Sequence, residues 1–200
     1  MALSIEDLIL QQDKRGVAQL RPHLPPDFCS QAASYIMDHP GDVVIVTGFY
    51  ILMTGTPETD GPPGAIAIGN ALQALGRKVT YVTDSVCLAA LRDLAGEDAE
   101  VIEFPITGVE ASKQAAREML ARLKPSLLIS IERSGRTKDD TYLNMRDADI
   151  TPNTARLDYL FEDGIPSVGI GDGGNEIGMA NLAEVRKDPG HESTCSPEIP

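Results

Sequence analysis

The chain has 200 residues, of which 42% are hydrophobic, and its formal net charge is −13. The apolar content indicates a globular protein with a substantial core rather than a disordered chain. The negative charge argues against nucleic acid or an anionic membrane as the main partner.

Two helices are predicted before residue 41. In SIEDLILQQ, Ser4 and Asp7 have a spacing similar to a capping box, and the apolar residues fall on one face. The prolines between positions 22 and 26 end this helix, and DFCSQAASYIMD predicts a second helix that ends at His39. We expect residues 1–41 to form an N-terminal helical segment that packs on the core.

From residue 42 onward, strand-like and helix-like patterns alternate five times. Short β-branched runs such as DVVIVTG and KVTYVTD are typical of buried parallel strands, and helices between them supply the crossovers that parallel strands need. The predicted fold is therefore α/β, with a doubly wound, mostly parallel sheet in a Rossmann-like three-layer arrangement and residues 42–200 as one domain. We expect strands at 42–48, 78–84, 100–106, 125–135 and 165–174, and helices at 62–76, 85–96, 109–124, 153–164 and from 175 onward.

Ligands of open α/β sheets bind beyond the carboxyl ends of the strands, which directs attention to three loops. The first loop, TGFYILMTGTPETDGPPG, offers Thr47 and Gly48 at its start and Asp60, Gly61 and Gly64 where the next helix begins. Backbone amides at a helix start often bind anions, so these five residues are candidates for substrate binding. The loop has neither a GK[ST] nor a GxGxxG motif, and the alternative is an ordinary long loop with a capped helix.

The second loop, SIERSGRTKDD, places Glu132, Arg133, Arg136 and Lys138 just after a hydrophobic strand. Basic residues are scarce in this acidic chain, and the planar fork of arginine suits a carboxylate. The alternative is a solvated charged loop. The segment 136–152, which follows, shows no clear element and is a candidate lid.

The third loop, GIGDGGNEIGMAN, combines glycines with acidic side chains. Gly173 and Gly174 let the backbone turn sharply and approach a ligand. Asp172, Asn175 and Glu176 supply oxygen atoms that suit a cation, either an ammonium group or a divalent metal such as Mg²⁺ or Mn²⁺. The alternative is that the carboxylates only cap the next helix, because its dipole favours negative charge there.

The cysteines and the first residues bear on the compartment. Cys29, Cys87 and Cys195 lie far apart without a CxxC spacing, as reduced thiols do. The acidic opening MALSIEDLIL is unlike a secretory or transit signal, and no apolar run reaches about 18 residues. We therefore expect a cytoplasmic location and no membrane span.

Four motifs together resemble the D-glutamate cyclase family: TGFYI, ETDGPPGA, IERSGR and above all GIGDGGNEIGMAN. The similarity runs in the same order through most of the chain, roughly from Asp27 to Cys195. The resemblance implies a lyase that converts D-glutamate to 5-oxo-D-proline and water. For eukaryotic relatives it implies the mitochondrial matrix.

The resemblance suggests how the loops share the chemistry. Asp172 and Glu176 are expected to bind the substrate ammonium, with one of them accepting its proton. Arg133 and Arg136 are expected to hold carboxylates and to offset charge in the tetrahedral intermediate. The amides of residues 61–64 are expected to hold the other carboxylate.

Several alternatives stay open at this point. A divalent metal on Asp172, Asn175 and Glu176 can replace the ammonium there and polarise the γ-carboxyl group. The chain can also be a metal-dependent lyase or hydrolase of another small acidic metabolite, or a non-catalytic module that binds an amino acid. In each case the partner is a small molecule, and homo-oligomerisation is compatible with all of them.

Overall fold

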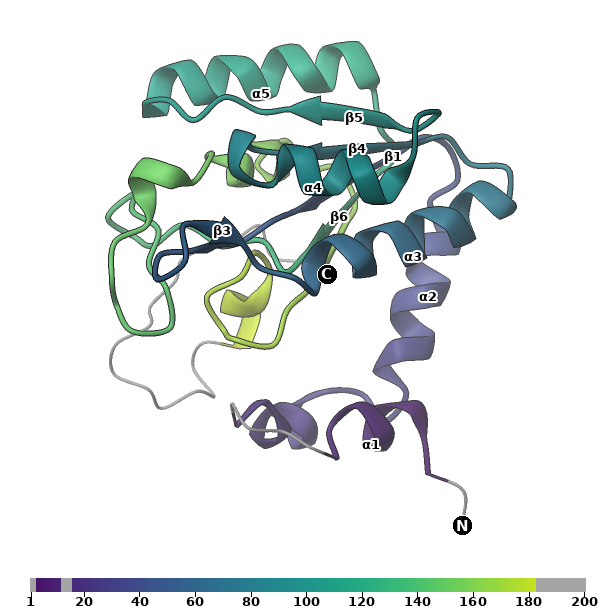
Figure 1. Ribbon diagram of the computed structural model, residues 1–200. Coiled ribbons are helices and arrows are strands. Elements are labelled where there is room, and N and C mark those ends of the chain that lie inside the picture. Colours follow the sequence, from purple (N-terminus) through teal and green to yellow (C-terminus); the bar gives the residue numbers. More distant parts are fainter. Residues whose placement is uncertain (1–2, 12–15, 183–200) are drawn as a thin grey trace.

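A computed structural model describes residues 3–11 and 16–182 of the chain (Figure 1). Its centre is a five-stranded, all-parallel sheet with the strand order β5-β4-β1-β6-β7. The strands are β1 (Val43–Thr47), β4 (Val79–Thr83), β5 (Glu100–Glu103), β6 (Leu127–Ile131) and β7 (Ser167–Ile170). A small antiparallel pair, β2 (Tyr50–Ile51) and β3 (Thr56–Pro57), lies in the loop after β1.

The strand order reverses beside β1. From β1 the chain builds outward through β4 to β5, and it then returns to place β6 on the other side of β1. In this pair Val43 is in register with Leu127, and Thr47 with Ile131. The carboxyl ends of β1 and β6 therefore meet at the switch point, where sheets of this kind bind ligands.

Helices cover both faces of the sheet, so the predicted doubly wound α/β fold is confirmed (Figure 1). On one face, α3 (Gly61–Ala74) and α4 (Ser85–Ala95) pack against alternate strand residues such as Val43 and Ile45. On the other face, α5 (Val109–Leu123) and the 3-10 helix η3 (Leu157–Phe161) pack against the intervening residues. The strands read as continuous apolar runs because both of their faces are buried.

The N-terminal segment forms an arm whose last helix joins the core. It contains α1 (Ile5–Ile9), the 3-10 helix η1 (Val17–His23) and α2 (Phe28–Asp38). The C-terminal part of α2 packs against the sheet layer, through Tyr35 and Ile36. In Figure 1, α1 lies well away from the sheet.

Two predicted helices differ from the structure. Instead of an α-helix at 153–164, the chain forms the short 3-10 helices η2 (Thr151–Asn153) and η3, and every residue of η3 is buried. After residue 175, the described part of the chain holds only a 3-10 turn, η4 (Met179–Leu182), and the rest of that predicted helix lies outside the described residues. Residues 175–177 instead pair with the backbone after β6, which competes with helix formation. None of the described helices is both long and apolar enough to cross a bilayer.

Candidate functional site

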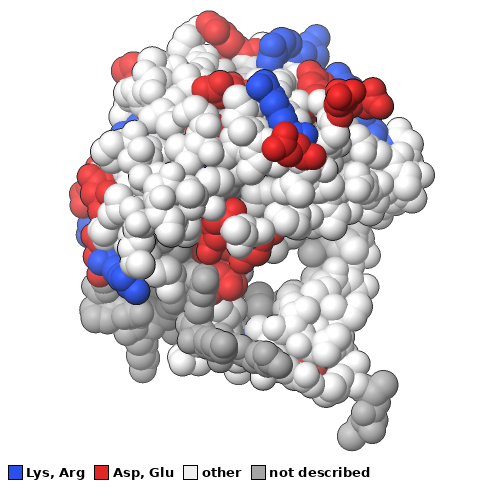
Figure 2. Space-filling view, in the orientation of Figure 1, with Lys and Arg blue, Asp and Glu red and all other residues white. Residues whose placement is uncertain are grey.

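Three carboxylates meet at the carboxyl ends of β6 and β7. They belong to Glu132, Asp172 and Glu176, and one oxygen atom from each lies within 4.8 Å of the other two. We call these three residues the acidic cluster. Figure 2 shows acidic side chains gathered where the start of α3 meets the segment after β7, beside the hollow between the body and the N-terminal arm.

Glu132 is held beside the switch point by its backbone. It has a left-handed φ of 45°, and its amide donates to the Ile170 carbonyl at 2.9 Å, which extends the pairing of β6 with β7. A Cβ atom on Gly61 would lie 2.8 Å from Thr47 Oγ1 and 2.9 Å from Glu132 Cβ. The start of α3 can approach β1 and β6 this closely only because residue 61 is glycine.

Glu176 is fixed by the loop that carries it, which we call the glycine turn (residues 171–176). Its two carboxylate oxygens accept hydrogen bonds from the amides of Gly173, at 2.7 Å, and Gly174, at 2.6 Å. A side chain on Gly173 would overlap the Glu176 carboxylate, so the glycine is needed for this contact. Glu176 is 2% exposed, and its carboxylate is therefore buried in one orientation.

Two further oxygen atoms near the acidic cluster are buried without a donor. Asn175 donates from Nδ2 to the Leu143 carbonyl at 2.8 Å, which leaves its Oδ1 without a hydrogen-bond partner among the described residues. Asn175 Oδ1 and Glu176 Oε1 lie close together, because both would contact a Cβ atom placed on Gly173. Thr47 Oγ1, next to Glu132, is also buried and has no hydrogen-bond partner in the described part of the chain. Hard oxygen atoms that lack donors are the ligands of a divalent metal or an ammonium group, so this set fits a cation.

The electrostatics of the cluster favour a cation as well. Burial raises the pKa of Glu132 to about 8, and the neighbouring carboxylates of Glu176, Asp172, Asp60 and Glu58 add to this increase. Burial also raises the pKa of Glu176, although the amides of the glycine turn oppose it. The folded chain therefore holds carboxylates that resist ionisation, and a bound positive charge would relieve their repulsion.

Arg133, which the sequence suggested as a catalytic residue, has its side chain in the core. Its guanidinium is 1% exposed and donates to Asp84 Oδ2 at 2.7 Å and to the Gly48 carbonyl at 2.8 Å from Nη1. Its Nη2 donates to the Ala155 carbonyl at 2.6 Å. The prediction that Arg133 contacts the substrate does not fit this arrangement. The arginine instead bonds to three segments, at Gly48, Asp84 and Ala155. Its backbone carbonyl accepts a hydrogen bond from the amide of Ile177, the residue directly after the glycine turn, at 2.9 Å.

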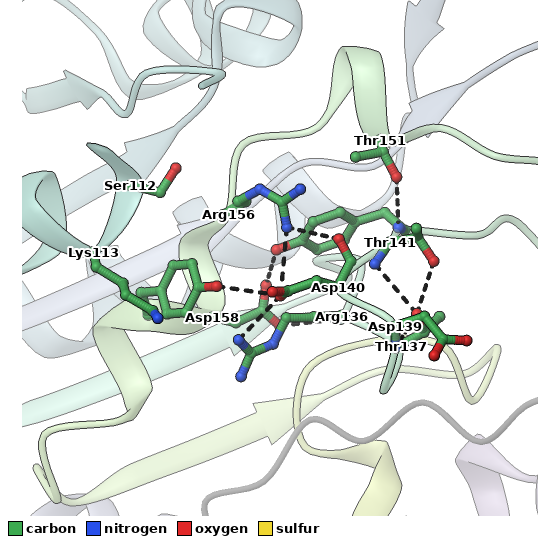
Figure 3. Close-up of polar contacts among 12 residues, drawn as sticks. Ser112, Lys113, Arg136, Thr137, Asp139, Asp140, Thr141, Thr151, Arg156 and Asp158 are labelled. Atoms are coloured by element: carbon green, nitrogen blue, oxygen red, sulfur yellow. Dashed lines mark hydrogen bonds and ion pairs between the residues drawn. The ribbon is translucent and has the colours of Figure 1, made fainter. Parts of the chain in front are cut away.

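Arg136, the second predicted carboxylate ligand, belongs to a separate polar network (Figure 3). Its guanidinium donates to Glu162 at 2.6 Å and to Asp140 at 3.2 Å, and it lies 4.7 Å above the ring of Tyr159. Figure 3 shows Arg136 and Arg156 turned toward Asp140 from two elements. Because its guanidinium already binds two carboxylates, Arg136 stabilises the segment after β6 rather than the acidic cluster.

The first loop also differs from expectation. The Gly61 amide binds the side chain of Asp60 at 2.9 Å, and the Gly64 amide binds the Asp60 carbonyl at 3.1 Å. Pro62 and Pro63 between them carry no N–H group. The start of α3 therefore has no amide to offer a substrate carboxylate, and Asp60 acts as a helix cap. This corrects the prediction that residues 61–64 bind an anion.

Gly48, another predicted substrate residue, serves packing. It has a φ of 111°, and a Cβ atom there would lie 2.8 Å from Thr83 Oγ1 and 2.9 Å from Cys87 Cβ. Its carbonyl accepts from Arg133. Gly48 is thus required for the close approach of β1 to the start of α4.

Comparison with known proteins identifies the family of the chain. The family model described as D-glutamate cyclase-like, C-terminal, matches residues 5–195. The chain belongs to this family. It is 35% identical over 186 residues to the human protein named mitochondrial D-glutamate cyclase, and the match covers 84% of this chain but 30% of that relative. A solved structure of an aldohexose dehydrogenase from Thermoplasma acidophilum matches 66% of this chain and 49% of its own, with 17% identity and a TM-score of 0.32.

Sequence reasoning missed two features around this candidate site. One is Asp84, which follows β4 and is the buried partner of Arg133. Its position at the carboxyl end of a strand was the available signal. The other is the segment around Leu143 and Met145, which contacts the glycine turn. Nothing in its polar sequence indicates where it folds back.

Proposed function

We propose that the chain is a lyase that converts D-glutamate to 5-oxo-D-proline and water, with the acidic cluster binding a cation during the reaction. The observation that carries the proposal is the set of three converging carboxylates beside two buried, unpaired oxygen atoms. The membership of the chain in the D-glutamate cyclase-like family supports the choice of substrate.

The reaction needs proton transfer at two groups of the substrate, the ammonium group and the γ-carboxyl group. The substrate nitrogen attacks the γ-carboxyl carbon, a C–N bond forms, and one C–O bond breaks. The ammonium group loses two protons, and the departing oxygen gains two to leave as water. Ring closure over five atoms is favoured when the substrate is held folded, so positioning contributes much of the rate.

Glu132 is the proposed group that moves these protons. With a pKa raised to about 8, it is partly protonated near neutral pH and can both accept and return a proton. Glu176 is the proposed charged member of the cluster, because amides of the glycine turn fix both of its oxygens. Asp172 completes the set.

The cation is either the substrate ammonium or a divalent metal such as Mg²⁺ or Mn²⁺. The ligands for a metal would be Glu132, Asp172 and Glu176, with Asn175 Oδ1 beside them. Such an ion would supply Lewis acidity that masks the charge of the γ-carboxylate.

The test is incubation with D- or L-glutamate, with EDTA or with added Mg²⁺ or Mn²⁺, followed by chiral chromatography of 5-oxoproline. We expect product from D-glutamate, and a loss of turnover of at least about a hundredfold in Glu132→Gln and Glu176→Gln. Glu118→Gln, on the exposed side of α5, is the control and should leave turnover unchanged. If folded protein forms no 5-oxoproline under any of these conditions, the proposed reaction is wrong. A ligand-induced rise in melting temperature without turnover would point to a binding module instead.

A further inference from the structure

An acidic amino acid brings two carboxylates to the acidic cluster, which itself consists of carboxylates. Arg133 and Arg136 do not bind these carboxylates, because their guanidinium groups already donate to Asp84, Glu162 and neighbouring groups. The start of α3 has no amide to offer. A bound metal at the acidic cluster would hold one substrate carboxylate at most, so the other needs a different positive partner.

The segment after Arg136 folds into a well-defined hairpin, which we call the 143–149 hairpin. Leu143 pairs with Asp149, and the Asn144 amide donates to the Ala148 carbonyl at 3.0 Å. The side-chain oxygen of Asn144 accepts from the amides of Arg146, at 2.8 Å, and Ala148, at 3.1 Å. The tip of the hairpin, which carries Arg146, is therefore fixed by its own hydrogen bonds.

This hairpin lies against the glycine turn. The Leu143 carbonyl accepts from Asn175 Nδ2 at 2.8 Å, and Met145 Sδ lies 3.0 Å from the position of a Cβ atom on Gly173. The same Cβ position is in contact with the Glu176 carboxylate. Met145 therefore reaches the edge of the acidic cluster, and Arg146 is the next residue along the tip.

The guanidinium of Arg146 has only a weak partner. Nη1 donates to Met53 Sδ at 3.4 Å, and Met53 is 79% exposed in the turn between β2 and β3. Within the described ranges, Arg146 forms no ion pair with a carboxylate. A thioether is a poor acceptor, whereas a carboxylate accepts two strong hydrogen bonds from an arginine fork, so a substrate carboxylate would displace it.

We propose that Arg146 binds the α-carboxylate of the substrate, the carboxylate that ring closure does not consume. This inference rests on the proposed function. The acidic cluster holds the cationic part of the substrate, and the 143–149 hairpin, which contacts the glycine turn through Leu143 and Met145, carries Arg146. Arg146 thereby selects amino acids whose α-carboxylate is free.

The test compares two substrates in Arg146→Ala, Arg146→Lys and a control, Arg92→Ala, whose arginine lies on α4. For D-glutamate we expect Arg146→Ala to raise KM at least about tenfold while kcat changes by less than about threefold, because a charge-assisted hydrogen bond is lost from binding. Arg146→Lys should recover part of this loss. With the α-amide of D-glutamate, which lacks the charge, Arg146→Ala and the parent chain should have equal KM values.

Binding measured by calorimetry with D-glutamate separates the two proposals. If D-glutamate binds and Arg146→Ala weakens its binding but no 5-oxoproline forms, the inference holds and the reaction is wrong. If 5-oxoproline forms and Arg146→Ala leaves KM unchanged, the inference is overturned while the reaction stands. If D-glutamate neither binds nor reacts, both are overturned. Arg146 is exposed, so an unchanged melting temperature is expected for all three variants.

Discussion

Glu132 combines three features that each raise the free energy of the folded chain. Its backbone has a left-handed φ of 45°, which costs free energy in any residue with a side chain. Its carboxylate is partly buried, and other carboxylates surround it. Such features concentrate at functional sites because binding of a ligand offsets them.

The stability of the chain should therefore depend on pH through Glu132. Its pKa rises from 4.5 to about 8 on folding, so the folded state favours the protonated form. Glu132 makes its full favourable contribution to the free energy of unfolding below pH 4.5. This contribution is lost as the pH rises through about 8. In EDTA, we expect Glu132→Gln to raise the melting temperature near pH 9 and to change it little near pH 5.

Thermal unfolding followed by circular dichroism at both pH values measures this difference. Glu118→Gln, whose carboxylate lies on the exposed face of α5, is the control and should have no such pH-dependent effect. An equal change in melting temperature at both pH values would contradict the assignment of the repulsion to Glu132.

At the scale of elements, Arg133 joins three segments that precede or follow strands. It links the end of β1 at Gly48, the start of α4 at Asp84 and the segment before η3 at Ala155. Asp84 Oδ2 also accepts from the Ala155 amide at 3.2 Å. This buried pair fixes the loop on either side of the switch point, and with it the backbone that carries Glu132.

Removal of one partner should leave a buried, unpaired charge. We expect Arg133→Met to lower the free energy of unfolding by about 3–5 kcal/mol. Arg133→Lys should not restore it, because one ammonium group cannot reproduce the fork that spans these acceptors. Urea denaturation measures the effect.

The exposed pair of Lys113 and Glu110 on α5, with 3.2 Å between its charged atoms, is the matched comparison. Lys113→Met should cost less than about 1 kcal/mol. A loss of that small size in Arg133→Met would show that the buried pair does not hold these elements together.

For the whole molecule, one side chain of the body, that of Arg77, makes several hydrogen bonds to the end of the N-terminal arm. Arg77, just after α3, donates to the Gly41 and Ile36 carbonyls, both at 2.9 Å, and also to the His39 carbonyl. These carbonyls lie at and after the end of α2, where a helix leaves its last acceptors unsatisfied. Arg77 thus sets where the arm leaves the core.

We expect Arg77→Ala to loosen the arm while the sheet stays folded. Chymotrypsin should then cleave after Phe28 and Tyr35 several times faster, because local opening exposes the backbone of α2. Mass spectrometry of the fragments measures the rate. Arg117→Ala, on exposed α5, serves as the comparison, and equal cleavage in the two variants would contradict the role of Arg77.

The sequence was sufficient to predict the sheet and the loops at its carboxyl edge. Buried runs such as VVIVT and LLISI identify the strands, and the carboxyl ends of parallel strands lie at one edge, so the loops after β6 and β7 were expected there. The predicted metal set held Asp172, Asn175 and Glu176, whereas the structure brings Glu132 to Asp172 and Glu176. The direction of neighbouring side chains was not predictable. Arg133 follows Glu132 directly, yet it points into the core because its partner, Asp84, lies on a different strand end.

The 3-10 helices had no clear sequence signal either. Apolar residues such as Leu157 and Leu160 have a spacing that also suits an α-helix. The tertiary contacts of Asp158, which accepts from the Arg136 amide at 2.9 Å and from Tyr142, hold this segment in its observed form. Such contacts join residues far apart in the chain and cannot be derived from local periodicity.

The mutual repulsion within the acidic cluster also bears on how this chain can be engineered. A library of variants that is selected for heat tolerance alone, at alkaline pH and without divalent ions, would enrich neutral replacements at Glu132 and its neighbours. The selected variants would be thermally stable but inactive, because the destabilising carboxylates are the ones proposed to act on the substrate. Variants should therefore be selected for turnover and for thermal stability at the same time.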